Sequence, residues 1–137
     1  MSETYAKPLP HPTIDTQPYW DGLQNRELRL QHCADCGKVR HYPRPVCDAC
    51  WSMKFEWKAA SGHGRVHSWT ITHHAFHPGF KPALPYTLVT VDLDEGVRIN
   101  ARMRGIDPAA LRIGLPVRIE FEPVTPEVTL PVVIPIT

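Results

Sequence analysis

The sequence predicts a mainly β protein with a short N-terminal helical segment, a small metal-binding module and a barrel of about five short strands. Three observations support this fold class. Four cysteines form two Cys-x-x-Cys pairs within residues 33–50. Runs of alternating apolar and polar residues recur after these pairs, as in half-buried strands. The chain of 137 residues contains 15 prolines, which argues against long helices.

The four cysteines predict one structural zinc ion. The ligands would be Cys33, Cys36, Cys47 and Cys50, with two residues inside each pair and ten between the pairs. Two such knuckles complete a tetrahedral site, and four thiolates leave no open position for catalysis. Gly37, directly after Cys36, suits the positive φ that a knuckle often needs.

Other interpretations of the cysteines remain open. Iron could occupy a four-sulfur site. The thiols could also be free and buried, or they could form a redox pair of the thioredoxin kind. A redox pair needs a βαβ context that the flanking residues do not show. Zinc is therefore the expected metal.

Net charge and hydropathy limit the possible partners and location. The 15 basic and 14 acidic residues give a formal charge of +1, and four thiolates with one Zn²⁺ would change it to −1. Nucleic acid is therefore not an expected partner. No run of about 18 apolar residues is present, so no membrane span is predicted. The N-terminus lacks signal-peptide features, and the cysteine spacing suits a reducing compartment, so we expect a cytoplasmic protein.

Composition divides the chain into three parts. The predicted domains are an N-terminal arm and short helix at 1–32, a zinc ribbon at 33–60 and a barrel at 61–137. Residues 1–15 are rich in proline and should form a loose arm unless a partner orders them. Thr16 is the predicted cap of a short helix that has Pro18 in its first turn and ends within residues 22–25.

Alternation predicts the strands. They are expected near residues 28–33, 55–59, 65–73, 86–93, 97–104 and 117–121. Asp107 should cap a single helical turn that begins at Pro108. The loop 75–85 is too rich in proline to be regular. Three prolines in the tail 125–137 should confine it to an edge strand or an extended arm.

No catalytic constellation is predicted. His73 and His74 would point to opposite faces of a strand, which disfavours a second metal site built from the nearby histidines. A Ser/His/Asp triad lacks the Gly-x-Ser-x-Gly elbow that would support it. Two basic groups could instead hold phosphates or simply be solvated. They are Lys38, Arg40 and Arg44 between the knuckles, and Arg98, Arg102 and Arg104 on one face of a strand.

An ordered set of motifs resembles a known family. The motifs are Tyr19–Leu23, Leu28–Gly37, Tyr42–Arg44, Ser61–Val66, Ser68–Thr70, Pro85–Tyr86 and Leu93–Arg98. Together they resemble the zinc-ribbon/OB-fold acyl-CoA-associated family known as domain of unknown function thirty-five. Asp48 and Ala49 depart from that pattern, because relatives often have proline between the last two cysteines.

The resemblance implies a fold and a role. The implied fold is an N-terminal helical hairpin, a rubredoxin-like zinc ribbon and a C-terminal OB-fold barrel. The implied role is a non-catalytic accessory subunit that docks on a thiolase-like or other acyl-CoA-processing enzyme of lipid metabolism. Coenzyme A or an acyl-CoA is the implied ligand, and its candidate binding residues are Lys38, Arg40, Arg44, Arg98 and Arg102.

Two further questions stay open at the sequence level. The first is whether the chain is instead a nucleic-acid-binding OB-fold/zinc-ribbon module. Such a module would stack bases on Trp69, Phe76 and Tyr86. The other concerns Phe76 and Phe80 in the proline-rich loop. These rings could anchor a partner protein, or they could fold back and cap the barrel.

Overall fold

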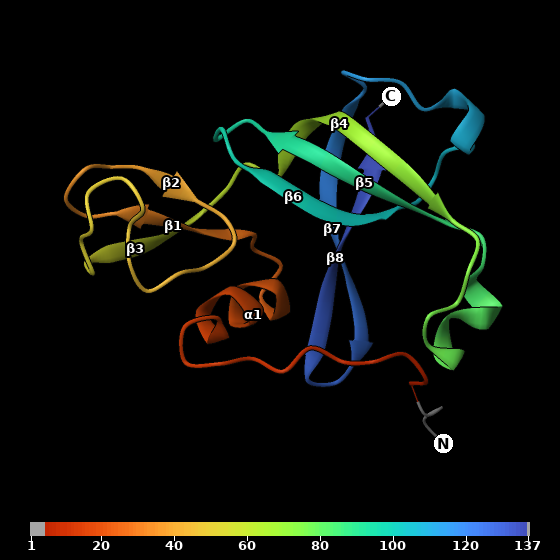
Figure 1. The fold of residues 1–137 in the computed structure, drawn as a ribbon, viewed down its shortest axis with the longest axis horizontal. Coiled ribbons are helices and arrows are strands. Elements are labelled where there is room, and N and C mark those ends of the chain that lie inside the picture. The colour runs from red at the N-terminus through yellow and green to blue at the C-terminus, as the bar shows by residue number, and fades with distance from the viewer. Residues whose placement is uncertain (1–4, 137) are drawn as a thin grey trace.

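The computed structural model describes residues 5–136 and contains one α-helix and eight strands in that range (Figure 1). In chain order the elements are α1 (Gln17–Gln24), β1 (Arg29–Cys33), β2 (Val39–Arg40), β3 (Phe55–Ala59), β4 (His63–Thr72), a 3₁₀ helix (Pro78–Ala83), β5 (Tyr86–Leu93), β6 (Arg98–Met103), a 3₁₀ turn (Pro108–Ala110), β7 (Pro116–Thr125) and β8 (Val128–Pro135).

The ribbon is built on a three-stranded antiparallel sheet in the order β2-β1-β3. Leu28 and Leu30, on and beside β1, are completely buried and join the apolar cluster of the barrel. Tyr19 and Leu23 of α1 enter the same cluster. The helix, the ribbon sheet and the barrel therefore share one continuous core.

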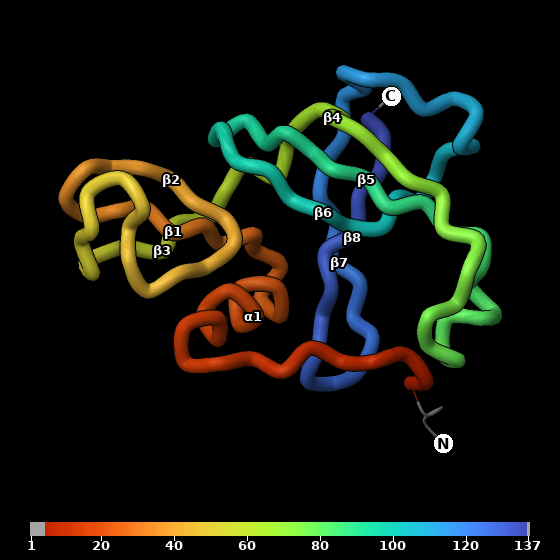
Figure 2. Tube along the Cα trace, viewed as in Figure 1, coloured from red at the N-terminus to blue at the C-terminus, as the bar shows by residue number. Residues whose placement is uncertain are grey.

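The second unit is a closed five-stranded barrel in the order β4-β5-β6-β8-β7, with β7 pairing back to β4 (Figure 2). Alternating residues of β5 and β6 fill the interior, among them Val89, Val91 and Ile99. The hairpin between these strands turns at Gly96, whose φ of +87° favours glycine. This strand order with a parallel β6-β8 pair is that of an OB-fold. The predicted fold class is thereby confirmed.

The C-terminal tail differs from the prediction of an edge strand or arm. β8 pairs with β7 along most of its length and with β6 at Val132 and Val133, so it closes the barrel. The prolines are tolerated because the pairing with β6 covers only those two positions. Pro131 and Pro135 lie outside it and need no N–H on that side.

The predictions for the N-terminal region and the proline-rich loop were partly wrong. The described residues hold one N-terminal helix, not a helical hairpin. Thr16 occupies its N-cap position but makes no capping bond there, since its hydroxyl accepts instead from the Thr13 N–H. The loop 75–85 contains a 3₁₀ helix, which His77 caps by accepting from the Gly79 N–H. Ala6 and Lys7 of the arm pack against that helix at Gly79.

Side-chain and backbone bonds connect the ribbon to the barrel. The Asn100 N–H of β6 donates to the Tyr42 hydroxyl at 3.1 Å. Gln24, at the end of α1, bonds Pro126 and Thr129 around the β7–β8 turn. The two units are thus held in a fixed relation, with α1 between them.

Candidate metal centre and apolar groove

The four predicted cysteines converge where β1 ends at Cys33. All four Sγ atoms lie within 4.8 Å of one another. Cys33 and Cys50 are 3.5 Å apart, and Cys36 and Cys47 are 3.6 Å apart. Sulfurs at the usual Zn–S distance of about 2.3 Å occupy tetrahedron corners about 3.8 Å apart, so the arrangement fits a structural zinc ion.

Two similar backbone turns place these sulfurs. The Gly37 N–H donates to the Cys33 carbonyl at 3.0 Å, and the Trp51 N–H donates to the Cys47 carbonyl at 3.0 Å. Both donors have a positive φ, 78° at Gly37 and 64° at Trp51. The expectation for Gly37 is confirmed. Trp51 holds the equivalent position in the second knuckle despite its bulk, and its side chain is 77% exposed.

Backbone N–H groups favour the thiolate form at two of the ligands. The Cys36 N–H points at the Cys33 sulfur, and the Ala49 N–H points at the Cys47 sulfur, both at 3.4 Å. The first contact is the largest cause that lowers the pKa of Cys33, to about 6, and the second is the largest that lowers the pKa of Cys47. A backbone N–H also acts on Cys36, but burial and the bond to Cys47 outweigh it and raise the pKa. The same holds for Cys50, where the bond to Cys33 and burial raise the pKa. Thiolates are the metal-binding form of cysteine. The backbone N–H groups therefore favour metal binding at Cys33 and Cys47.

The basic residues Lys38, Arg40 and Arg44 make hydrogen bonds and ion pairs with other residues of the ribbon. Lys38 lies 2.7 Å from a carboxylate oxygen of Asp48, which raises the pKa of Lys38. Arg40 is buried, donates to the Gln31 side chain at 2.7 Å and lies over the Phe55 ring. Arg44 is exposed, and its backbone joins the same cluster by donating to Gln31. These three residues therefore do not form one open cationic surface.

The barrel arginines separate into two groups. Arg98 donates to Asp92 at 2.7 Å, on the turn side of the hairpin. Arg102, near the end of β6, and Arg104, just after that strand, line a groove of about 540 Å³. Of the five candidate ligand residues, only Arg102 faces this groove.

The groove lies against the outer surface of the barrel. It is bounded by the arm, α1, the ribbon loop that carries Tyr42, the 3₁₀ helix and strands β5 to β8. Apolar and aromatic side chains make up most of the wall, including Tyr19, Trp20, Phe80 and Tyr86. A volume of this size is typical of small-molecule sites.

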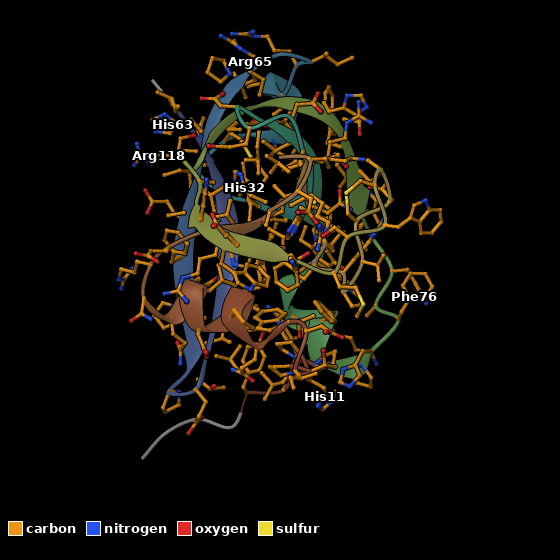
Figure 3. All side chains as sticks on the ribbon, turned by 90° about the vertical axis from the view of Figure 1, so that its left-hand side faces the viewer. His11, His32, His63, Arg65, Phe76 and Arg118 are labelled. Atoms are coloured by element: carbon orange, nitrogen blue, oxygen red, sulfur yellow. The ribbon has the colours of Figure 1, made fainter. Side chains whose placement is uncertain are left out.

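Among residues 5–136, no histidine lines the groove or joins the cysteine cluster. His67 lies 3.2 Å from Asp92, and His77 caps the 3₁₀ helix. Figure 3 shows His63 beside Arg118, its pairing partner on β7, and Phe76 on the opposite side of the molecule. His41 is mostly buried against Tyr19, and burial lowers its pKa to about 4. None of the helices in residues 5–136 has the length and apolar character needed to cross a membrane.

A four-sulfur centre on a three-stranded sheet, followed by a closed five-stranded barrel, defines a zinc-ribbon/OB-fold protein. The family model for the ChsH2 rubredoxin-like zinc ribbon domain matches residues 20–56, and that for the ChsH2 C-terminal OB-fold domain matches residues 57–122. A DUF35 domain-containing scaffold protein of Methanothermobacter thermautotrophicus is 32% identical over 82% of this chain and 86% of its own length. The chain belongs to the DUF35 family, which confirms the resemblance.

Two further relatives are named as subunits of CoA enzymes, and one solved structure is also similar. A probable enoyl-CoA hydratase alpha subunit of Thermomonospora curvata is 37% identical over 95% of this chain, which spans 42% of that protein's length. The benzoylsuccinyl-CoA thiolase subunit BbsA of Geobacter metallireducens is 33% identical over 69% of this chain and 61% of its own. A chain in the solved structure of an Ltp2-ChsH2(DUF35) aldolase matches with a TM-score of 0.85 at 36% identity, covering 93% of this chain and 98% of that one.

The sequence reasoning missed most of the groove. In the sequence, Arg104 belongs only to a charged stripe, and no pattern marks Tyr5, Lys7 or Glu122 as neighbours of that stripe. The even spacing of Arg102 and Arg104 in the sequence predicts one shared face, although β6 ends between them at Met103. Nothing in the irregular arm indicates that Lys7 would lie against the same face.

Proposed function

We propose that this chain is a non-catalytic accessory subunit that docks on a thiolase-like acyl-CoA-processing enzyme and supports it. The observation that carries the proposal is the likeness, along nearly the whole chain, to a chain of the Ltp2-ChsH2(DUF35) aldolase. The thiolase subunit among the relatives supports the same class of partner. Cys33, Cys36, Cys47 and Cys50 are assigned to structural zinc, and no residue is assigned to catalysis.

Exposed aromatic and methionine side chains, which protein interfaces favour, are the natural docking contacts. Phe76 is 89% exposed and points away from the body of the molecule (Figure 3). Trp51 and Met53, at the second knuckle, are 77% and 71% exposed. Phe80 behaves differently, because its ring lies 5.6 Å from that of Tyr86 and it lines the groove. We therefore assign docking to Phe76 and the knuckle, and packing on the barrel to Phe80.

The first test identifies the partner. The tagged full chain is purified from its native host, and the proteins that elute with it are identified by mass spectrometry. The proposal predicts a stoichiometric complex with a thiolase-fold or other acyl-CoA-processing enzyme. A chain that elutes alone under gentle conditions, or only with proteins of unrelated chemistry, contradicts it.

Substitutions then map the docking surface. Phe76→Ala and Trp51→Ala should weaken the complex at least about tenfold while the melting temperature of the free chain stays constant. Ile113→Ala is the matched control, because Ile113 is 75% exposed and makes no part of the proposed surface. Phe80→Ala should instead lower the melting temperature. Unchanged association in both docking variants contradicts the assigned surface.

The proposal includes coenzyme A or an acyl-CoA as ligand, shared with the partner enzyme. Calorimetry on the free chain and on the complex tests this point. If coenzyme A and acyl-CoA bind to neither, the ligand is withdrawn from the proposal. Tight, salt-sensitive binding of the free chain to single-stranded DNA would favour the nucleic-acid-binding alternative. The cytoplasmic location and the domain boundaries at residues 32/33 and 60/61 stay predictions.

A further inference from the structure

The groove is closed on one side by the N-terminal arm. Tyr5, Lys7 and Pro8 form part of its wall. In Figure 1 the arm runs from α1 past the turn between β7 and β8 toward the 3₁₀ helix. There it crosses Gly79, where an added Cβ would overlap the Ala6 carbonyl and lie 2.9 Å from the Lys7 Cα. Because Gly79 has no side chain, the arm can pack closely against the 3₁₀ helix at this residue.

The groove carries uncompensated positive charge. Arg104 donates two bonds to Glu122, at 2.8 and 3.0 Å, so this pair is neutral. Lys7 and Arg102 have no carboxylate within 4.0 Å among residues 5–136. Burial and the neighbouring Arg102 lower the pKa of Lys7, which indicates that the cations crowd one another.

Aromatic rings hold these two cations in place without neutralising them. The Lys7 amine lies 5.5 Å from the centroid of Phe80, and the Arg102 guanidinium lies 5.7 Å from that of Tyr86. The two rings are themselves 5.6 Å apart. Cation–π contacts of this kind orient a positive group but leave its charge available to an anion.

We propose that the groove binds an amphipathic anion, with its apolar body against the aromatic wall and its carboxylate or phosphate between Lys7 and Arg102. The inference rests on the proposed function only for the physiological source of this ligand, which would be an acyl-CoA or the acid derived from it. The arm closes over the bound molecule, and Lys7 is the residue through which it contacts the charged group.

Binding is tested on the full free chain, so the result does not depend on docking. Calorimetric titrations use decanoate, its neutral analogue decanamide, decanoyl-CoA and coenzyme A alone. The proposal predicts that decanoate or decanoyl-CoA binds at least about tenfold more tightly than decanamide, since a charge-assisted bond is stronger than a neutral one. Comparing the affinity for decanoate with that for decanoyl-CoA shows whether the bound anionic group is a free carboxylate or a phosphate of coenzyme A. Equal affinity for decanoate, decanoyl-CoA and decanamide, or no binding by any of them, overturns the proposal.

Three variants and one control locate the site. Lys7→Gln and Arg102→Gln should each weaken binding of the anion about tenfold or more and leave decanamide unaffected. Lys58→Gln removes the same charge from β3, outside the groove, and should change nothing. Gly79→Ala keeps every charge but displaces the arm, and it should weaken binding with zinc content and melting temperature retained. Full affinity in Lys7→Gln and Arg102→Gln places the ligand elsewhere and overturns the assignment, whether or not the chain docks on its partner.

Discussion

The zinc ribbon and the barrel lie side by side but are stabilised by different means. Between residues 34 and 54 the buried residues are Arg40 and Cys47, and neither is an aliphatic core residue. The barrel instead buries aliphatic residues from all five strands, among them Val66, Val91 and Val133. A module this small cannot bury enough apolar surface to be stable by itself. Metal–thiolate bonds therefore supply in the ribbon the stabilisation that the apolar core supplies in the barrel.

The contrast explains why one region is easy to recognise from sequence and the other is not. A metal site needs specific residues at specific spacings, whereas a core needs only apolar residues at alternating positions. It also predicts that the two regions respond differently to the same kind of damage.

Loss of one zinc ligand should have the largest effect. Cys47 is fully buried among the ligands. Cys47→Ser should reduce zinc from about one ion per chain to almost none and unfold the knuckles, because structural zinc can supply about 10–16 kcal/mol in small domains. Elemental analysis and hydrogen exchange resolved by residue measure both effects. Exchange in β5 and β6 should stay slow. A metal-free protein with native protection in residues 33–54 contradicts the account.

A core substitution should show the opposite pattern. Ile99 is 1% exposed inside the barrel. Ile99→Ala should cost about 2–5 kcal/mol of unfolding free energy through lost burial and a cavity. Urea unfolding gives the free energy, and zinc content of the folded protein should stay unchanged. Ile113→Ala, at an exposed position, should cost almost nothing. Equal costs for the two substitutions would refute the assigned core.

The polar cluster at the base of the ribbon should give an intermediate effect. The Gln31 side-chain oxygen accepts from Arg40 at 2.7 Å and from the Arg44 N–H at 2.8 Å. Gln31→Leu should cost about 1–3 kcal/mol, because it leaves buried donors unpaired. Adding Arg40→Leu should recover part of that cost. Additive losses in the double variant, measured by urea unfolding, would show that the two side chains are not coupled.

The smallest effect should come from a cap. The Asp107 carboxylate accepts from the Ala109 N–H at 2.9 Å and caps the turn Pro108–Ala110. Asp107→Ala should lower stability by about 0.5–1 kcal/mol, and Asp107→Asn, which also caps, should lower it less. Differential scanning calorimetry can resolve the two variants. Equal melting temperatures for wild type and both variants would show that the cap contributes nothing.

Much of the fold was predictable because local patterns determine it. Alternation placed the β5–β6 hairpin, and the Asp107-Pro108 cap lies where expected. The role of β8 was missed for a non-local reason. Whether a proline falls in a paired or an unpaired stretch depends on strand register, and the parallel contact with β6 is not encoded near residue 131.

The candidate site divides in the same way. The zinc ligands follow from spacing within 18 residues, and their sulfurs do converge. The groove is assembled from the arm, α1, a ribbon loop and four strands, so no short segment contains its pattern. Net charge gave no indication of it either, since a formal charge of +1 hides the local excess at Lys7 and Arg102.

We propose that this chain supports an acyl-CoA enzyme and performs no chemistry itself. This proposal is tested most directly by measuring acyl-CoA turnover with the purified chain, with its co-purifying partner and with the reconstituted complex. The account predicts no turnover by the chain alone, and an active complex that is faster or more stable than the partner alone. Turnover by the isolated chain that disappears on a single side-chain substitution would contradict it.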